Sequence, residues 1–165
     1  MAKNTEGLWA FALRLYGRPG VSDACLVLQD RSGVDVPVLL FSAWLSKASV
    51  PLTERDLKRV DGLVKAWRDE VTIPLRAVRR RLKASSHPAP GQPAEDLRND
   101  VKAAELASEK IELAILEAQR ATLADTAPTS TRRNISVVVR YYRGAEPDAE
   151  AGQALAVIES ALSAL

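Results

Sequence analysis

Two long segments with helical character flank a stretch that a helix cannot cross. The stretch is "SSHPAPGQPA", residues 85–94, which holds three prolines, one glycine and no charged residue. This composition is typical of an exposed connector, because proline lacks the backbone donor that a helix interior needs. The segments on its two sides, residues 52–84 and 95–124, are therefore expected to fold back on each other as a long antiparallel helical hairpin.

Both arms of the expected hairpin carry apolar residues at helical spacing. In the first arm, Thr53 is expected to cap the helix, and an apolar stripe recurs every three or four residues from Leu57 to Leu82. Pro74 interrupts this arm, so we expect a kink or a break near residues 71–73. The second arm approximates a 3.5-residue repeat, formed by Leu97, Val101, Ala104, Ile111 and Ile115.

Three shorter helices are expected before the hairpin, as a compact N-terminal core over residues 5–48. The first ends at Gly17, placed as the left-handed residue that terminates the helix, and Pro19 is expected at an early position of the second. The second helix ends at Gly33. The third, capped by Asp35, is apolar on nearly every side, which indicates the centre of the fold.

The C-terminal segment, residues 131–165, is expected to hold the remaining helices. Its "NISVVVRYY" stretch, residues 134–142, has the composition of a strand, but the chain offers no second strand to pair with it. We therefore predict a helix there, followed by a last helix that Asp148 caps. The expected fold is all-α: a single-domain bundle of six or seven helices over residues 1–165, with the long antiparallel hairpin as its largest feature.

The composition excludes several broad classes of protein. The chain has 165 residues, of which 47% are hydrophobic, and a formal net charge of +2, so no overall field demands an anionic partner. One cysteine cannot form an internal disulfide, and the N-terminus lacks the pattern of a secretory signal, which favours the cytoplasm. The longest apolar run, residues 36–45, has about half the length that a membrane span needs.

Charge is nevertheless segregated along the chain. Residues 51–84 have a net charge of +5, whereas residues 95–125 have a net charge of −4. Four basic residues of the first segment share one helical face and could follow the phosphates of a nucleic acid: Arg76, Arg79, Arg80 and Lys83. The alternative is that these side chains pair with the acidic helix or are simply solvated.

Catalytic and metal-binding motifs are not found. Cys25 lies on an apolar helical face, and the single histidine, His87, lies in the connector, so a cysteine nucleophile would lack its base. The "GRPG" turn at residues 17–20 is a poor phosphate site, because Pro19 removes one backbone amide. We expect no cofactor and no metal, and the sequence favours a protein that is not an enzyme.

Polar and aromatic residues of the N-terminal core are the candidates for a small-ligand site. Carboxylates there could serve acid–base chemistry, although a helix cap or an exposed face explains isolated aspartates equally well. A pocket in this core would be lined by Trp9, Tyr16, Gln29, Asp30 and Asp35.

Two stretches resemble a known family. They are "LWAFALRLYGRPGVSDACLVLQDRSGVDVPVLLFSAWL", residues 8–45, and the tryptophan at 67 followed by "PLRAVRRRLK", residues 74–83. Both are similar to the DUF2390 family of bacterial proteins of unknown function. The resemblance implies a small, cytoplasmic, helical protein and brings no established activity. It directs attention to Trp9, Tyr16, Cys25, Gln29, Asp30, Asp35 and Arg76.

The sequence therefore leads to three hypotheses of function. Segregated charge on two long helices, without a catalytic motif, favours a non-enzymatic helical module that binds a protein partner or itself. The second hypothesis is RNA or ribosome binding through the basic face at residues 76–83. The third is a small-ligand-binding protein, or an enzyme of unrecognised type, with its pocket in the N-terminal core.

Overall fold

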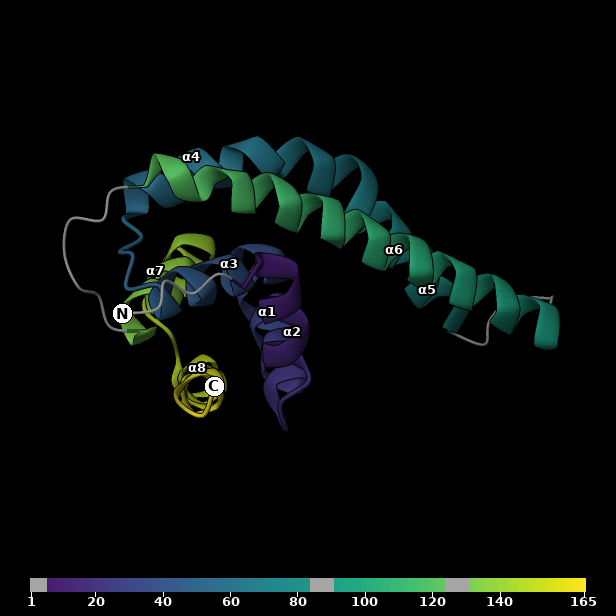
Figure 1. Cartoon of the computed structure of the whole chain (residues 1–165). Coiled ribbons are helices and arrows are strands. Elements are labelled where there is room, and N and C mark those ends of the chain that lie inside the picture. Colours follow the sequence, from purple (N-terminus) through teal and green to yellow (C-terminus); the bar gives the residue numbers. More distant parts are fainter. Residues whose placement is uncertain (1–5, 84–90, 124–130) are drawn as a thin grey trace.

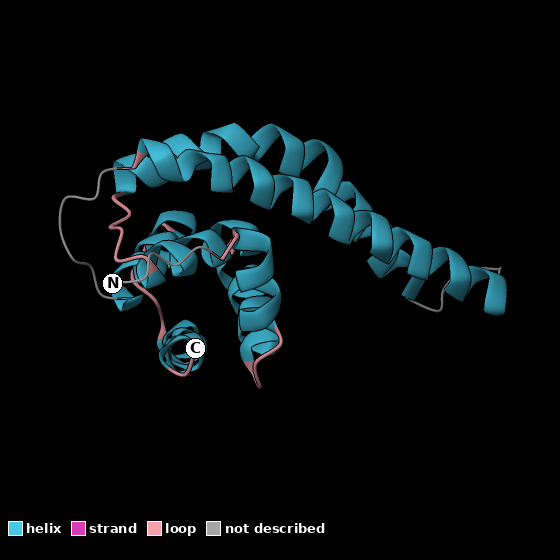
Figure 2. Cartoon of the chain, viewed as in Figure 1, coloured by secondary structure: helices cyan, strands magenta, loops and turns pink. Residues whose placement is uncertain are grey.

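The computed structural model describes residues 6–83, 91–123 and 131–165, and every regular element within these ranges is helical (Figures 1 and 2). The π-helical turn η1 joins α4 to α5 without a gap, so the described residues form seven helices and a short 3₁₀ turn, η2. The predicted all-α class is confirmed. The bounds are α1 (Leu8–Tyr16), α2 (Val21–Ser32), α3 (Val36–Lys47), α4 (Glu54–Trp67), η1 (Arg68–Thr72), α5 (Ile73–Lys83), α6 (Gln92–Ala118), η2 (Gln119–Thr122), α7 (Thr131–Arg143) and α8 (Ala149–Ser163).

Helix α3 lies at the centre, as its sequence predicts. Its residues from Val36 to Ser46 are all buried, and it packs against α1, α6 and α7. The Asp35 carboxylate caps it by accepting a hydrogen bond from the backbone amide of Val38 at 3.2 Å, which satisfies one of the free donors of the first turn. Although α3 is strongly apolar, no helix in the described ranges has the length and apolar character to cross a membrane.

The turn between α1 and α2 differs in detail from the prediction. Gly17 follows α1 in a right-handed conformation, with φ at −75°, and Gly20 is the left-handed residue, with φ at +80°. Pro19 lies before α2 rather than in its first turn. Gly20 suits this left-handed conformation because it has no side chain, and a Cβ there would meet Val157 of α8 at 3.2 Å.

Helices α4, η1 and α5 form one arm of an antiparallel hairpin, and α6 forms the other (Figure 1). The far end of the hairpin projects beyond the other helices. Helix α6 begins at Gln92, three residues earlier than expected, because Pro93 fits the first turn, where its missing donor has no helical partner. Residues 85–90 of the predicted connector, which include His87, lie outside the described ranges, whereas Gly91 lies within them.

Pro74 neither breaks the first arm nor ends it. The helix is irregular close to the predicted residues 71–73, but the irregularity is the five-residue π-helical turn η1 and not a break. In this turn, the amide of Ile73 donates to the carbonyl of Arg68, five residues earlier. This wider turn directly precedes the proline, whose ring would clash with the carbonyl of Glu70 in a regular α-helix. The arm therefore stays continuous through the proline.

The ambiguous segment at residues 134–142 is helical and belongs to α7. Asn134 anchors it: its fully buried side-chain amide accepts from the backbone amide of Leu52 at 3.0 Å and donates to the carbonyl of Val50 at 2.8 Å. These bonds satisfy backbone groups of the α3–α4 connection that no helix pairs. Packing of α7 against α3 thus overrides the strand preference of the valines.

Candidate functional site

The seam between the two arms of the hairpin is polar. The Nε of Arg76 donates to Glu105 at 2.9 Å, the Nη2 of Arg76 donates to Glu109 at 2.9 Å, and the Nε of Arg79 also donates to Glu105. Burial opposes ionisation of Glu105, but the bonds from both arginines outweigh it and lower its pKa. The arms are held together here by charge-assisted hydrogen bonds in place of apolar contacts.

The apolar repeat expected on α6 is half-buried at Val101 and Ile115 but exposed at its other three positions. Leu97 and Ile111, a multiple of seven apart, are 52% and 47% exposed, and Ala104 between them is exposed as well. The residues one position later in each repeat are buried or half-buried and form the polar seam: Arg98, Glu105 and Glu112. At these positions of α6, polar residues therefore lie inside the hairpin and apolar residues lie on its flank.

These apolar residues lie on the side of the hairpin that faces away from the other helices. Leu113 is buried in the core, and Ile111, two residues earlier, is turned by about 200° around the helix axis. On α5, Arg80 reaches Asp30 of α2 at 2.9 Å, and Val78, again two residues earlier, points nearly the opposite way with 48% exposure. Each arm thus presents apolar side chains outward.

We call this surface the outer face. On α5, this surface consists of Val78 and the leucines three residues before it and four residues after it. On α6, it consists of Ile111 and the apolar residues seven and fourteen positions before it. None of its members is buried, and all of α5 lacks a buried residue. Six residues make up the outer face: Leu75, Val78, Leu82, Leu97, Ala104 and Ile111.

A buried cluster of ionisable side chains lies where the hairpin meets α3 and α7. Three carboxylates, one guanidinium and two phenols come from five elements, and the carboxylates and the guanidinium are each less than 9% exposed. The members are Asp35 before α3, Asp61 of α4, Arg68 of η1, Glu112 of α6, and Tyr141 and Tyr142 of α7.

Arg68 is the centre of this cluster. Its Nη1 donates to Asp61 at 2.8 Å and to the hydroxyl of Tyr142 at 3.1 Å, and it lies 3.5 Å from Asp35. Asp61 also accepts hydrogen bonds from the hydroxyls of Tyr141, at 3.0 Å, and of Tyr142. A charge taken out of water is tolerated only with such partners, so the cluster ties four helices to one cation.

Glu112 holds a proton within this cluster. Its side chain is fully buried, and neither carboxyl oxygen meets a hydrogen-bond donor among the described residues. Burial, and then the charge of Asp35, raise the pKa of Glu112 to about 9, and burial raises the pKa of Asp35 as well. A protonated Glu112 can donate to the Asp35 carboxylate, which removes the repulsion between the two acids.

The chemistry open to this cluster is limited by its closure. The described residues contain no group of three or more His, Cys, Asp or Glu arranged to hold a metal ion. With Glu112 neutral, one guanidinium faces two carboxylates, and all of them are already committed to one another. The cluster is therefore best explained as the polar core that fixes the hairpin on α3 and α7.

The predicted ligand residues of α1 lie apart from one another. Trp9 is half-buried, and the ammonium of Lys110 stands over its ring at 5.1 Å from the centroid. Tyr16 ends α1 with 38% exposure, and burial of the rest of its side chain raises its pKa. Each packs against the hairpin from the side opposite the outer face.

Of the remaining three predicted ligand residues, Gln29 and Asp30 lie together on α2, and Asp35 lies before α3. Asp30 is exposed and pairs with Arg80, whose hydrogen bond lowers the pKa of this carboxyl, and Gln29 contributes a further bond to it. Asp35 belongs to the buried cluster and caps α3. These residues thus have partners on different elements, and none of the five lines the hollow between α7 and α8. Cys25 is fully buried as predicted, and burial raises the pKa of its thiol to about 12.

Three of the four predicted phosphate-binding residues are engaged within the chain. Arg76 and Arg79 bind the carboxylates of α6, and Arg80 binds Asp30. Lys83 is exposed at the end of α5. The arrangement is the alternative that the charge pattern offered, in which the basic helix pairs with the acidic one.

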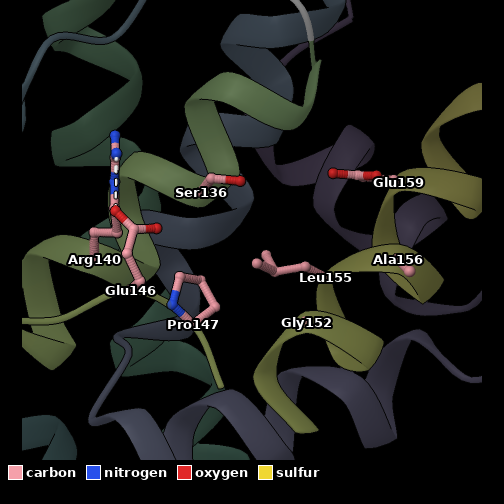
Figure 3. Close-up of a pocket in the computed structure, with 8 residues that line it drawn as sticks. All are labelled: Ser136, Arg140, Glu146, Pro147, Gly152, Leu155, Ala156 and Glu159. Carbon is pink, nitrogen blue, oxygen red and sulfur yellow. Dashed lines mark hydrogen bonds and ion pairs between the residues drawn. The ribbon is translucent and has the colours of Figure 1, made fainter. Parts of the chain in front are cut away.

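A surface hollow of about 380 Å³ lies between α7 and α8 (Figure 3). Arg140 of α7 donates to Glu146 at 3.3 Å on its rim, and Leu155 of α8 forms part of its wall. None of the predicted site residues lines it. Arg140 and Glu146 neutralise each other on the rim, and Glu159 of α8 also lines the hollow.

Residues 7–116 match the model of a family described as "Protein of unknown function (DUF2390)". The chain belongs to the DUF2390 family. The DUF2390 region runs from the start of α1 almost to the end of α6, so it includes the whole outer face and four members of the buried cluster. Tyr141 and Tyr142 follow it. Comparisons with curated proteins and with solved structures found no match.

Sequence reasoning missed the buried cluster, although one signal was present. Asp61 lies four residues after Leu57 and three before Val64, and Arg68 lies four after Val64, so both polar residues fall on the apolar stripe of the first arm. A charged residue on a buried stripe requires a buried partner. Glu112 gave no such signal, because it lies outside the apolar repeat expected on α6.

Proposed function

We propose that this member of the DUF2390 family is a helical protein-interaction module that binds through the outer face of its hairpin. The observation that carries the proposal lies in the part of the hairpin formed by α5 and the facing half of α6: its seam is polar, and apolar residues of both arms are left unburied on the side away from the core. A contiguous apolar surface rimmed by charge is typical of a protein interface. A cytoplasmic location is part of the proposal, because Cys25 is a free thiol.

The position of the outer face supports this function. The far end of the hairpin projects beyond the other helices, and α5 buries no residue within the chain (Figure 1). Two arms lying side by side with unburied apolar side chains offer a surface to the apolar face of a further amphipathic helix. The arginine–glutamate seam beneath keeps the arms in place without that partner.

The test is capture of protein partners by variants of the full chain. Val78→Asp and Ile111→Asp place a charge on the outer face, and we expect both to lose partners that the wild-type chain binds. Leu26→Asp is the matched control, because Leu26 of α2 is an apolar residue of similar exposure, 42%, in another part of the fold.

Partners are sought in an extract of the source organism. A second copy of this chain, co-expressed with a different tag, is tested as a partner in the same way. Loss of the same partner in both outer-face variants, with retention in the control, supports the module. If every captured protein is retained by Val78→Asp and Ile111→Asp, the proposal is wrong. Capture of RNA that falls steeply with salt and needs Lys83 would instead favour the nucleic-acid alternative.

A further inference from the structure

We propose that the outer face binds a second copy of this chain, with α5 of each copy lying over α6 of the other. This inference rests on the proposed function and names the partner of the same surface. It follows from the distribution of charge along the two arms and from the symmetry that a dimer imposes.

The two arms carry opposite charge up to the edge of the outer face. Helix α5 has five basic residues and no acidic one, whereas α6 has seven acidic residues and three basic ones. Pairing of Arg76, Arg79 and Arg80 within the chain leaves Arg81 and Lys83 as the basic residues of α5 that a partner can meet. Arg81 lies three residues after Val78, and Asp100 lies three after Leu97, so each borders the outer face. Both are exposed, and neither has an ion-pair partner among the described residues.

When the arms of the two copies are aligned, a two-fold axis can stack one outer face on another in two ways. A two-fold axis across the hairpin would place α5 on α5 and α6 on α6, with like charges opposed. A two-fold axis along the hairpin places the basic α5 of each copy on the acidic α6 of the other. Complementary charge selects the second arrangement.

The register of the hairpin then brings specific residues together. Thr72 hydrogen-bonds to Ser108, and Arg79 to Glu105, so Arg81 and Asp100 stand at nearly the same height along the two arms. Rotation about an axis along the hairpin preserves height. Arg81 of one copy therefore faces Asp100 of the second copy, and the reverse pair forms on the other side.

The size of the outer face sets the strength expected of this dimer. Leu97 and Ile111 are fourteen residues apart, which corresponds to about 21 Å of helix, and two helices side by side are about 20 Å wide. The resulting area, about 400 Å² on each copy, is in the range of weak and reversible interfaces. We therefore expect dissociation in the micromolar range.

The experiment is sedimentation equilibrium of the purified full chain across the micromolar range. The wild-type chain is expected to change from monomer to dimer, and Val78→Asp, Ile111→Asp and the milder Ile111→Ser are expected to weaken the dimer about tenfold or more. Leu26→Asp is expected to dimerise as the wild type does. Circular dichroism and thermal unfolding verify that each variant is folded.

Charge reversal tests the arrangement itself. Arg81→Asp and Asp100→Arg are each expected to weaken the dimer, because each creates like-charge pairs, and the double variant is expected to restore it. A dimer that Val78 and Ile111 variants leave unchanged overturns the inference. A double variant that dimerises no more tightly than either single variant also overturns the inference.

Failure of this inference can be told apart from failure of the proposed function. A wild-type chain that stays monomeric throughout overturns the dimer. If such a chain still captures another protein, and Ile111→Asp loses it, the interaction module stands with a different partner. If neither a dimer nor an outer-face-dependent partner is found, both proposals are wrong.

Discussion

Glu112 is a carboxylic acid that the fold keeps uncharged. It lies fully buried between Asp35 and the Arg68 guanidinium, which is 3.8 Å away and already bonded to Asp61. A proton on Glu112 is less costly than a third carboxylate charge beside one arginine. The folded protein therefore binds a proton that the unfolded chain releases at neutral pH.

Glu112 is expected to make the protein less stable as pH rises. Its pKa is raised to about 9 in the folded chain, from an ordinary value of 4.5, so the folded state holds more protons between these limits. Its contribution to the free energy of unfolding is fully present below about pH 4 and is lost as pH rises through the folded pKa. Urea unfolding near pH 5 and near pH 9 measures the difference.

The control for this effect is Glu112→Gln, which keeps the size of the side chain and cannot ionise. We expect it to remove most of the decline and to be more stable than the wild type near pH 9. Equal pH dependence in both proteins would show that Glu112 is ionised in the folded state.

Removal of Arg68 is expected to be the most damaging single change in the buried cluster. Arg68→Met leaves Asp35 and Asp61 without their cation and should cost about 3–5 kcal/mol of unfolding free energy. Arg81→Met, an exposed arginine on the same arm, should change it by less than about 0.5 kcal/mol. Chemical denaturation of the two variants distinguishes a structural cluster from a solvated one.

At the scale of elements, the hairpin combines a charged seam with an apolar flank. Its stability within one chain depends on a few hydrogen-bonded ion pairs, of which those of Glu105 are the least exposed. Half-buried pairs of this kind are screened little by salt, in contrast to the exposed pairs elsewhere on the helices.

Glu105→Gln is expected to loosen the hairpin more than the loss of an exposed pair. Arg76 and Arg79 would keep only part of their hydrogen bonds to this position, which should lower the unfolding free energy by about 1–3 kcal/mol. The matched control is Glu95→Gln on the same helix, because Glu95 pairs with Arg98 at the surface and is 53% exposed. Thermal unfolding that ranks the two variants equally would contradict a structural seam.

The element pattern of this chain could be predicted from sequence to a large extent. Caps at Asp35, Thr53 and Asp148 follow from local hydrogen bonding and are all present. Which positions of the repeat on α6 are exposed could not be predicted, because local spacing gives a period and not the neighbour that each face meets. The partners of the candidate ligand residues could not be predicted for the same reason: residues close in sequence, such as Asp30 and Asp35, have partners on different elements.

At the scale of the whole molecule, burial decreases along the hairpin from the core to the far end. Leu113 and Leu116 are buried against the other helices, whereas α5 buries nothing. Opening of a segment requires less free energy where fewer apolar contacts are lost. The far end is therefore expected to open independently of the core.

Amide hydrogen exchange measured by mass spectrometry tests this gradient. Peptides from residues 73–83 and 92–104 are expected to exchange about tenfold or more faster than those from residues 108–118. If the dimer forms, protection of the far end should increase with protein concentration. Uniform protection along α6 in dilute protein would contradict the gradient.

The seam also determines how the two arms align along their length. Arg98, Glu105 and Glu112 repeat every seven residues on α6, but their charges do not repeat. A slip of α6 by one heptad would set Arg98 in the place of Glu105, against Arg76 and Arg79, and bring three cations together. The seam thus opposes a slip of α6 in this direction, and the distance from the core to each residue of the outer face depends in part on charges that a partner never touches.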